Sequence, residues 1–349
     1  MQFSFDPATI AWAREVILHQ PNLDVLDAER EGSYSPLVRA IESELKKRDA
    51  AGMLLLPNLS ALANQTIGIF SDYSGESSGH YYTYSFLICA YGSLGVFLER
   101  MRQAREKFGI GKKEIAFKDF EKDTVKRVLP SYLEMLNGYV SGMLFTLVID
   151  KRLVSLFGAS NRSTTKALAE MLKERGFGER KPQVAEKIMR IVHTSAYLTA
   201  LLGHQGQKIL WMTDHDSIAP NPKMHNRMLA LFNNVLGLYT NRTFALLGGA
   251  LPFAERSTDY LDLLSAADIA AGAVAQYFTS RRLVGEHNVS VKPGAEKVLQ
   301  WLGLDAVGLK KLCMMISAGS NGAILFGTVE FTPTKMPETA TFLPIHLCR

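Results

Sequence analysis

Three short apolar runs in this chain each end in an aspartate. The runs TIGIFSD, MLFTLVID and KILWMTD close at Asp72, Asp150 and Asp214. Apolar runs of this length are typical of buried strands, and the aspartates stand where those strands end. Carboxylate oxygens are the hard ligands that Mg²⁺ and Mn²⁺ prefer, so these residues predict a divalent-metal site.

A fourth aspartate, Asp268, lies in the segment LDLLSAADIAAGAVAQYF. It falls in register, at spacings of three and four residues, with apolar positions that would share one face of a helix. A carboxylate on such a face costs several kcal/mol unless a cation or hydrogen-bond donors compensate it. We therefore expect Asp268 to join the strand-end aspartates. The apolar positions are Leu261, Leu264, Ala271, Ala275 and Phe278.

Alternating strands and helices must position these side chains. Strands at 67–72, 144–150 and 208–214 separated by helical crossovers predict parallel pairing, which brings their carboxyl ends to one edge of the sheet. The segment YYTYSFLICAY is expected to be a hairpin partner of the first strand. The expected helices span about 163–175, 182–202, 223–238 and 258–281.

The chain divides by pattern into three parts. Residues 1–65 are predicted to form a helical N-terminal extension, since Ser35–Pro36 is a typical helix start. Residues 66–285 carry the α/β alternation. Residues 286–349 are expected to form a small C-terminal appendage of helices and a strand.

Composition is that of an ordinary globular protein. The 349 residues are 47% apolar and 21% charged, with a formal charge of +5. The three cysteines exclude a disulfide framework and a CxxC zinc pattern, which favours a reducing, cytoplasmic location. We expect no secretory signal and no membrane span, because the longest apolar stretch is interrupted and too short.

The motifs also resemble a known family. Asp72 opens an Asp-x-Ser-Gly sequence, Glu114 begins an E-I-x-F-x-D segment, Asp150 precedes Lys151, and the late helix reads A-D-I-A-A around Asp268. In this order, over about 66–282, they resemble an uncharacterised branch of the ribonuclease-H-like superfamily. That branch has an Asp-Glu-Ser-Gly first motif and a Gln-x-x-Asp motif on its last helix.

The resemblance implies a ribonuclease-H-like mixed α/β sheet flanked by helices. It implies Asp72, Asp150 and Asp268 as metal ligands, with Asp214 as an auxiliary ligand and Glu114 as a further acidic site residue. This chain departs from the pattern at two positions, where Tyr73 replaces Glu and Ser265 replaces Gln. Glu76 is a candidate to supply the missing carboxylate.

The function expected from these residues is a Mg²⁺- or Mn²⁺-dependent nuclease that cleaves phosphodiesters by a two-metal mechanism. Residues 100–127 hold ten Lys or Arg against five Asp or Glu, so they favour a nucleic-acid surface or a solvated helix pair. DNA and RNA remain equally open as partners. The expected phosphate contacts are Lys112, Lys113, Lys118 and Lys151.

Three other functions stay open. The departures at Tyr73 and Ser265 are compatible with an inactive ribonuclease-H-like protein that binds nucleic acid or a partner. The same carboxylates would also serve a hydrolase of a small phosphorylated substrate. In a purely structural protein, by contrast, Asp268 would be paired with Arg or Lys. The apolar N-terminal helices additionally allow a homo-oligomer.

A second polar segment, WMTDHDSIAPNPKMHN, holds His215, Asp216 and His225. These residues could ligate zinc or iron, although the prolines favour a polar loop. An S-x-x-K sequence from Ser163 to Lys166 is expected by chance in a chain of this length, and we give it no weight.

Overall fold

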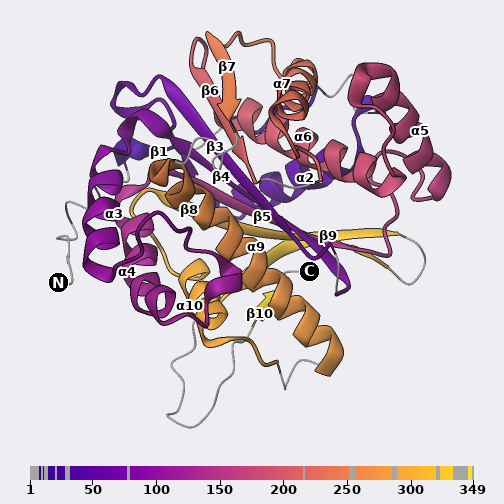
Figure 1. Ribbon diagram of the computed structural model, residues 1–349. Coiled ribbons are helices and arrows are strands. Elements are labelled where there is room, and N and C mark those ends of the chain that lie inside the picture. The colour runs from indigo at the N-terminus through magenta and orange to yellow at the C-terminus, as the bar shows by residue number, and fades with distance from the viewer. Residues whose placement is uncertain are drawn as a thin grey trace.

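The fold is built on one mixed β-sheet with helices on both faces. It was obtained as a computed structural model. The described residues are 8, 11, 15–19, 22–27, 32–76, 79–214, 217–250, 257–284, 289–319, 323–332 and 345–347. The expected mixed α/β architecture is confirmed, with helices gathered on either side of the sheet (Figure 1).

Eight strands form this sheet in the order β10-β9-β8-β5-β4-β3-β6-β7. The expected hairpin is confirmed, because β3 pairs antiparallel with β4, which pairs antiparallel with β5. On its other side β3 pairs parallel with β6, and β6 with β7. The strands are β3 (Thr66–Ser74), β4 (Tyr81–Ala90), β5 (Gly142–Asp150), β6 (Lys208–Thr213), β7 (Leu246–Ala250), β8 (Leu309–Ala318), β9 (Ile324–Phe331) and β10 (Ile345–Leu347).

The five strands β5-β4-β3-β6-β7 have one reversed member, β4. This arrangement is consistent with the ribonuclease-H-like sheet that the family resemblance implies. Strands β3 and β5 run in the same direction but are separated by β4, whereas β3 and β6 are direct parallel neighbours. The expectation of parallel strands is therefore correct in direction, and direct pairing is confined to β3 and β6.

Each face of the sheet carries its own apolar core. Along β3, Ile67 and Ile69 pack on one side while Phe70 packs on the other, as the period of two in a strand requires. We call the two sides the α6 face and the α9 face. The α6 face is covered by α2 (Pro36–Ala50), α5 (Arg162–Leu172), α6 (Pro182–Leu202) and α7 (Pro222–Leu236); the α9 face by α3 (Gly95–Phe108), α4 (Asp123–Tyr139), α9 (Thr258–Val284) and α10 (Pro293–Leu302).

Both ends of the chain contribute to these same layers. Helix α2 packs into the α6-face core, and its Glu44 accepts hydrogen bonds from the backbone and hydroxyl of Thr328 in β9. Strands β8 to β10 extend the sheet beyond β5. β1 (Leu18–His19) and β2 (Leu56–Pro57) form a separate two-stranded sheet, in which β2 contacts β5 and β8 of the main sheet. The division at residues 65 and 285 remains a prediction.

Helix α9 is the element that carries a carboxylate to the sheet. Most of its first twenty residues are buried, because the sheet lies on one side and α10 and the segment after α3 lie on the other. Its alanines keep it close to both neighbours. Gly272 is required for that closeness, since a Cβ there would lie 2.2 Å from a ring carbon of Phe117.

Candidate metal and nuclease site

Asp72 is placed by β3 on the α9 face. It lies two residues after Phe70 and so points to the same side of the sheet. Its side chain is 5% exposed. Its Oδ1 accepts a hydrogen bond from the backbone N–H of Tyr73 at 2.5 Å.

Asp268 approaches from α9. Its Oδ2 accepts the backbone N–H of Phe117 at 2.6 Å, and the side chain is partly buried. Three residues earlier, the Ser265 hydroxyl accepts the N–H of Ile115 at 3.3 Å and donates to the carbonyl of Leu261 at 2.8 Å. One face of α9 thus holds the backbone of the segment that contains Glu114.

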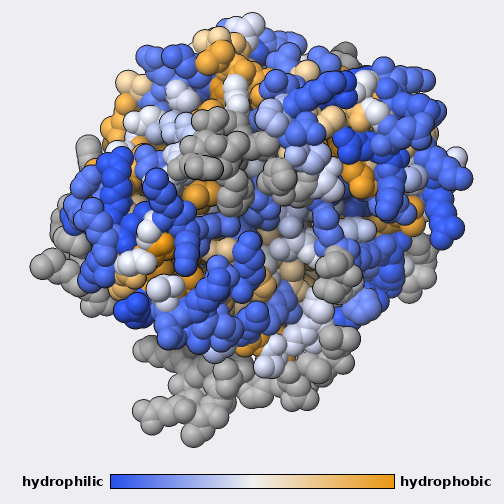
Figure 2. All heavy atoms as spheres, in the orientation of Figure 1, coloured by the Kyte–Doolittle hydropathy of each residue, from blue (hydrophilic) through white to orange (hydrophobic). Residues whose placement is uncertain are grey.

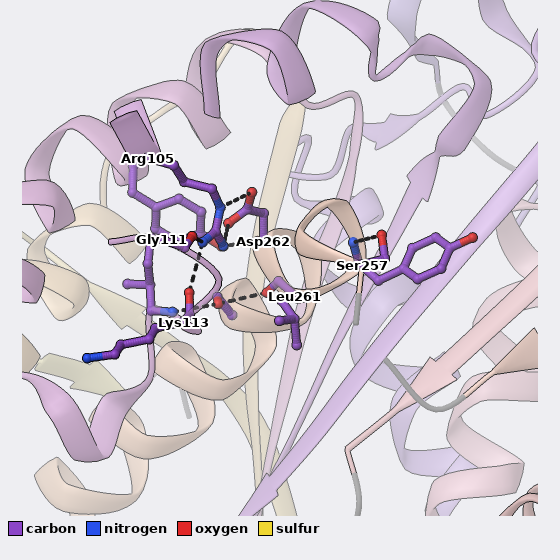
Figure 3. A network of polar contacts seen from close by, with 10 residues as sticks. Arg105, Gly111, Lys113, Ser257, Leu261 and Asp262 are labelled. Atoms are coloured by element: carbon purple, nitrogen blue, oxygen red, sulfur yellow. Dashed lines mark hydrogen bonds and ion pairs between the residues drawn. The ribbon is translucent and has the colours of Figure 1, made fainter. Parts of the chain in front are cut away.

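Glu114 is fixed from its other side by Arg105. The Arg105 Nη1 donates to the carbonyls of Gly111 at 2.7 Å and Lys113 at 2.9 Å. The same guanidinium forms a buried ion pair with Asp262 of α9, at 2.5 and 3.0 Å (Figure 3). Backbone contacts therefore hold the chain on both sides of Glu114, although this segment is neither helix nor strand.

Asp214 directly follows β6, the parallel neighbour of β3. Its backbone N–H donates to the Ser71 carbonyl at 3.2 Å, so the pairing of the two strands continues to the level of Asp72. The side chain is partly exposed. The sequence expectation that these two strand ends meet is confirmed in the geometry.

Asp72, Glu114, Asp214 and Asp268 lie close enough for their charges to affect one another, and we call these four groups the carboxylate cluster. Burial raises the pKa of Asp72 well above its ordinary value, and the charges of Asp268, Asp214 and Glu114 raise it further. Burial and the charges of Asp268 and Asp214 raise the pKa of Glu114 to about 8. The pKa of Asp268 rises to about 6, mainly through burial and also through Asp214.

Three of the four carboxylates have no ion-pair partner among the described residues. Within the described part of the chain, Asp72, Glu114 and Asp268 form no ion pair. Lys118 is exposed, and its charge lowers the pKa of Glu114 and Asp268 but does not offset the rise. Asp268 is therefore not the paired carboxylate that a purely structural role would require.

As the side chains lie, no three His, Cys, Asp or Glu groups among the described residues are arranged to hold one metal ion. Mutual repulsion is a sufficient reason for carboxylates without a cation to stay apart. The donor chemistry fits a hard divalent cation, because the cluster supplies only carboxylate oxygens. The types of ligand atom therefore suit a divalent cation, whereas the present positions of the side chains do not. The side chains must rotate to bind an ion.

Asp150 is not brought to the cluster. In register, Asp72 is opposite Ser85 and Ser85 is opposite Thr146, so Asp150 lies four residues further along β5, or about 13 Å. Its carboxylate instead accepts hydrogen bonds from Arg152, at 2.6 to 2.9 Å. Burial would raise the pKa of Asp150, but Arg152 and the charge of Arg282 lower it.

The predicted phosphate contacts divide between the two faces. Lys112 and Lys113 are exposed immediately before Glu114, and Lys118 is exposed next to the cluster. Lys151 lies elsewhere, with its Nζ 5.0 Å from the centre of the Tyr82 ring and in a cavity on the α6 face. Of the four lysines, Lys118 is therefore the one whose charge reaches the cluster.

The two departures from the family pattern have structural roles. Tyr73 points to the α6 face, where its hydroxyl contacts the hydroxyls of Ser71 at 2.7 Å and Thr213 at 3.0 Å. Ser265 holds the Glu114 segment, as described above. Glu76 does not supply the missing carboxylate, because it forms an ion pair with Lys187 of α6.

The second polar segment gives no cluster within the described residues. His215 and Asp216 lie outside the described residues. His225 is 2% exposed in α7, where burial lowers its pKa. The histidine is therefore part of the packed interior.

Sequence reasoning missed the ion pair of Arg105 and Asp262. Asp262 stands between Leu261 and Leu263 on the helix that carries Asp268, so a second carboxylate in an apolar helix was the available signal. Its pKa rises to about 6 through burial, although Arg105 opposes that rise. Nothing in the spacing of residues 105 and 262 shows that they meet.

Comparison with known proteins adds little. No family model matches the chain, and no curated protein matches its sequence. Among solved structures, the ribonuclease H2 from Pyrococcus horikoshii OT3 is similar, with a TM-score of 0.32 and 12% identity over 67% of this chain and 85% of that chain. A TM-score of 0.32 is too low to support a fold assignment, so the description of the fold depends on the strand order alone. Within the described residues, no helix has the length and apolar character to cross a membrane.

Proposed function

We propose that the carboxylate cluster binds divalent Mg²⁺ or Mn²⁺ and that the protein hydrolyses nucleic-acid phosphodiesters. The observation that supports this most is the carboxylate cluster itself. Among the described residues, Asp72, Glu114 and Asp268 have no ion-pair partner. Gathering such charges is costly, and a divalent cation is the ligand that removes the cost.

Asp72 and Asp268 are the proposed central ligands. One carboxylate oxygen of Asp72 accepts the backbone N–H of Tyr73, and one of Asp268 accepts that of Phe117. Each hydrogen bond fixes its side chain and leaves lone pairs on the carboxylate for a cation. Asp214 and Glu114 are the proposed flanking ligands. When bound, divalent ions supply a nucleophilic hydroxide at neutral pH and neutralise charge that develops on the phosphate.

The role of the protein residues is to position the substrate and to control protons. Glu114 has a pKa near 8 without a cation, so it holds a proton at neutral pH that a bound cation must displace. Lys118 is close enough to the cluster to lower the pKa of Glu114 and Asp268, and the exposed Lys112 and Lys113 precede Glu114 in the chain, so these three are the proposed phosphate contacts. We assign the substrate to nucleic acid on this basis, and leave the choice between DNA and RNA to the assay.

A second candidate function is nucleic-acid binding without turnover. The observation that favours it is the pair of departures, since Tyr73 turns its side chain away from the cluster and Ser265 serves the backbone. This candidate retains salt-dependent binding through the lysines. It excludes metal-dependent cleavage.

The experiment that separates the candidates is an end-labelled cleavage assay on single-stranded and duplex DNA, RNA and hybrid substrates. It uses Mg²⁺, Mn²⁺ or EDTA, with binding measured in parallel over a range of salt. Cleavage that needs the metal supports the nuclease. Binding with a steep salt dependence and no cleavage on any substrate supports the second candidate.

A further inference from the structure

A cavity of about 570 Å³ lies on the α6 face, on the opposite side of the sheet from the carboxylate cluster. Its walls come from the β3–β4 hairpin, the segment after β5, and the beginnings of α5 and α6. A volume of this order is usual for small-molecule sites, which range from about 300 to 1,000 Å³. Figure 2 shows mainly hydrophilic side chains over the region of α5.

Positive charge dominates the lining of this cationic cavity. Among the described residues that line it, five basic side chains face two carboxylates, Glu76 and Glu186, which is a surplus of three positive charges. The five basic residues are Lys151, Arg162, Lys181, Lys187 and Arg190. They come from three separate segments of the chain, so the surplus is produced by the fold and not by one run of charge.

One buried ion pair forms the floor. Arg190 is 2% exposed and donates from Nε to Glu186 at 2.9 Å and from Nη2 to the Leu153 carbonyl at 3.0 Å. Glu186 also accepts the Ser155 hydroxyl and the Leu156 N–H, each at 2.9 Å. Its carboxylate is satisfied by these donors, so it contributes little to neutralising the rest of the cavity.

Lys187 is a second buried cation in the lining of the cavity. It is 6% exposed, and its Nζ lies 4.7 Å from the centre of the Tyr73 ring. It forms an ion pair with Glu76, whose side chain is 44% exposed and comes from the loop after β3. Because Glu76 is exposed, an anion from solution can replace its carboxylate in this ion pair.

Arg162 and Lys181 stand at the rim. Both are exposed, and in the described part of the chain neither side chain has an ion-pair or hydrogen-bond partner. Arg162 is the first residue of α5, and Lys181 directly precedes α6. Each helix begins at the cavity, so the positive ends of two helix dipoles add to the charge of the side chains.

We propose that the cationic cavity binds a ligand through a phosphate group, as a site separate from the carboxylate cluster. Buried Lys187, the rim residues Arg162 and Lys181, and the positive ends of the two helices provide charge complementary to phosphate oxygens. The phosphate belongs either to a small phosphorylated molecule or to the phosphorylated end of a nucleic acid. This site does not depend on the cluster having activity.

The test is isothermal titration of the full-length protein with pyrophosphate at physiological salt, in EDTA so that the cluster holds no metal. Wild type is expected to bind one equivalent. Arg162→Gln combined with Lys181→Gln should weaken binding about tenfold or more, because each hydrogen bond to a charged group contributes about a factor of ten. Both positions are exposed, so this double variant should fold normally.

The matched control is Lys107→Gln combined with Arg127→Gln, which removes the same charge from exposed positions on α3 and α4. The control should bind pyrophosphate as wild type does. Absence of saturable binding to wild type, or equal weakening in both double variants, would overturn the proposal.

A competition arm identifies the source of the phosphate. Displacement of bound pyrophosphate by small polyphosphates alone would identify a small phosphorylated molecule as the ligand. Displacement by a 5′-phosphorylated oligonucleotide as well would identify the end of a nucleic acid. The same oligonucleotide with a 5′-hydroxyl should not displace it. Equal displacement by both oligonucleotides would contradict a phosphate-specific site, because it would show only general attraction between polyelectrolytes.

Discussion

Replacing Asp268 by Asn should stabilise the protein when no metal is present. Asn keeps an oxygen to accept the N–H of Phe117 and removes one charge from the cluster. The folded-state pKa of Asp268 is about 6, above the ordinary value of 3.8. A raised carboxylate pKa means that the folded state is favoured by protonation, so stability is complete below about pH 3.8 and is lost as the pH rises through 6.

The size of this loss follows from the two pKa values. At about 1.36 kcal/mol for each pH unit between them, the charged Asp268 destabilises the fold by about 3 kcal/mol at pH 8 and by about half of that at pH 5. Asp268→Asn should recover up to these amounts. The gain in unfolding free energy should therefore roughly double from about pH 5 to about pH 8.

Urea unfolding in EDTA at the two pH values measures the gain directly. In Mn²⁺ the gain at pH 8 should shrink strongly, because an ion at about 100 times its Kd stabilises wild type by about 2.7 kcal/mol and the variant by less. Asp259→Asn, in the first turn of the same helix, is the matched control. A loss of stability for Asp268→Asn at pH 8 in EDTA would refute the reasoning, since it would show that the carboxylate is compensated.

Three further predictions concern the support of Glu114. Because the pKa of Glu114 is about 8, Mn²⁺ affinity measured by calorimetry should increase about tenfold for each unit that the pH is raised toward 8. Glu114→Gln should flatten this pH dependence. Gly272→Ala should lower the free energy of unfolding by about 1–3 kcal/mol, measured by heat or urea, and weaken Mn²⁺ binding, because the added Cβ displaces Phe117. The control Gly138→Ala, which has open space around the added Cβ, should change neither quantity. Arg105→Gln should cost about 3–5 kcal/mol in urea unfolding by leaving a buried carboxylate without a partner. A normal urea midpoint for Arg105→Gln would contradict that ion-pair assignment.

The strand pattern allowed much of the fold to be predicted. Apolar runs gave β3, β5 and β6 within a few residues, and the helix at 182–202 has the predicted bounds. Periodicity is reliable here because each run is bounded by turn residues and packs against a full layer. The eight-strand order could not be predicted, since it depends on contacts far apart in the sequence.

The site was predictable only where position along a strand decides it. Asp72 and Asp214 meet because their strands are parallel neighbours. Asp150 also ends a strand, yet β5 extends further past the level of Asp72, and register is a property of pairing that the sequence of one strand does not reveal. Glu114 lies in a segment without periodicity, so only the family resemblance pointed to it.

The cationic cavity had no signal in the sequence at all. Its basic residues are spread from Lys151 to Arg190 among acidic and apolar neighbours, and no run of charge marks them. Burial of Lys187 and Arg190 in α6 is a consequence of tertiary packing. The sequence placed Lys151 with the nuclease lysines because it follows Asp150, whereas alternation along β5 turns it to the other face.

The central claim is that the carboxylate cluster performs metal-dependent phosphodiester cleavage. The most direct measurement is the cleavage rate in Mn²⁺ of wild type, Asp72→Asn and Asp150→Asn on the best nucleic-acid substrate. Because bound metal contributes several kcal/mol to the transition state, Asp72→Asn should lose about a hundredfold to a thousandfold in rate, and Asp150→Asn should retain activity while folded. Equal rates for Asp72→Asn and wild type, with cleavage still requiring Mn²⁺, would contradict the account.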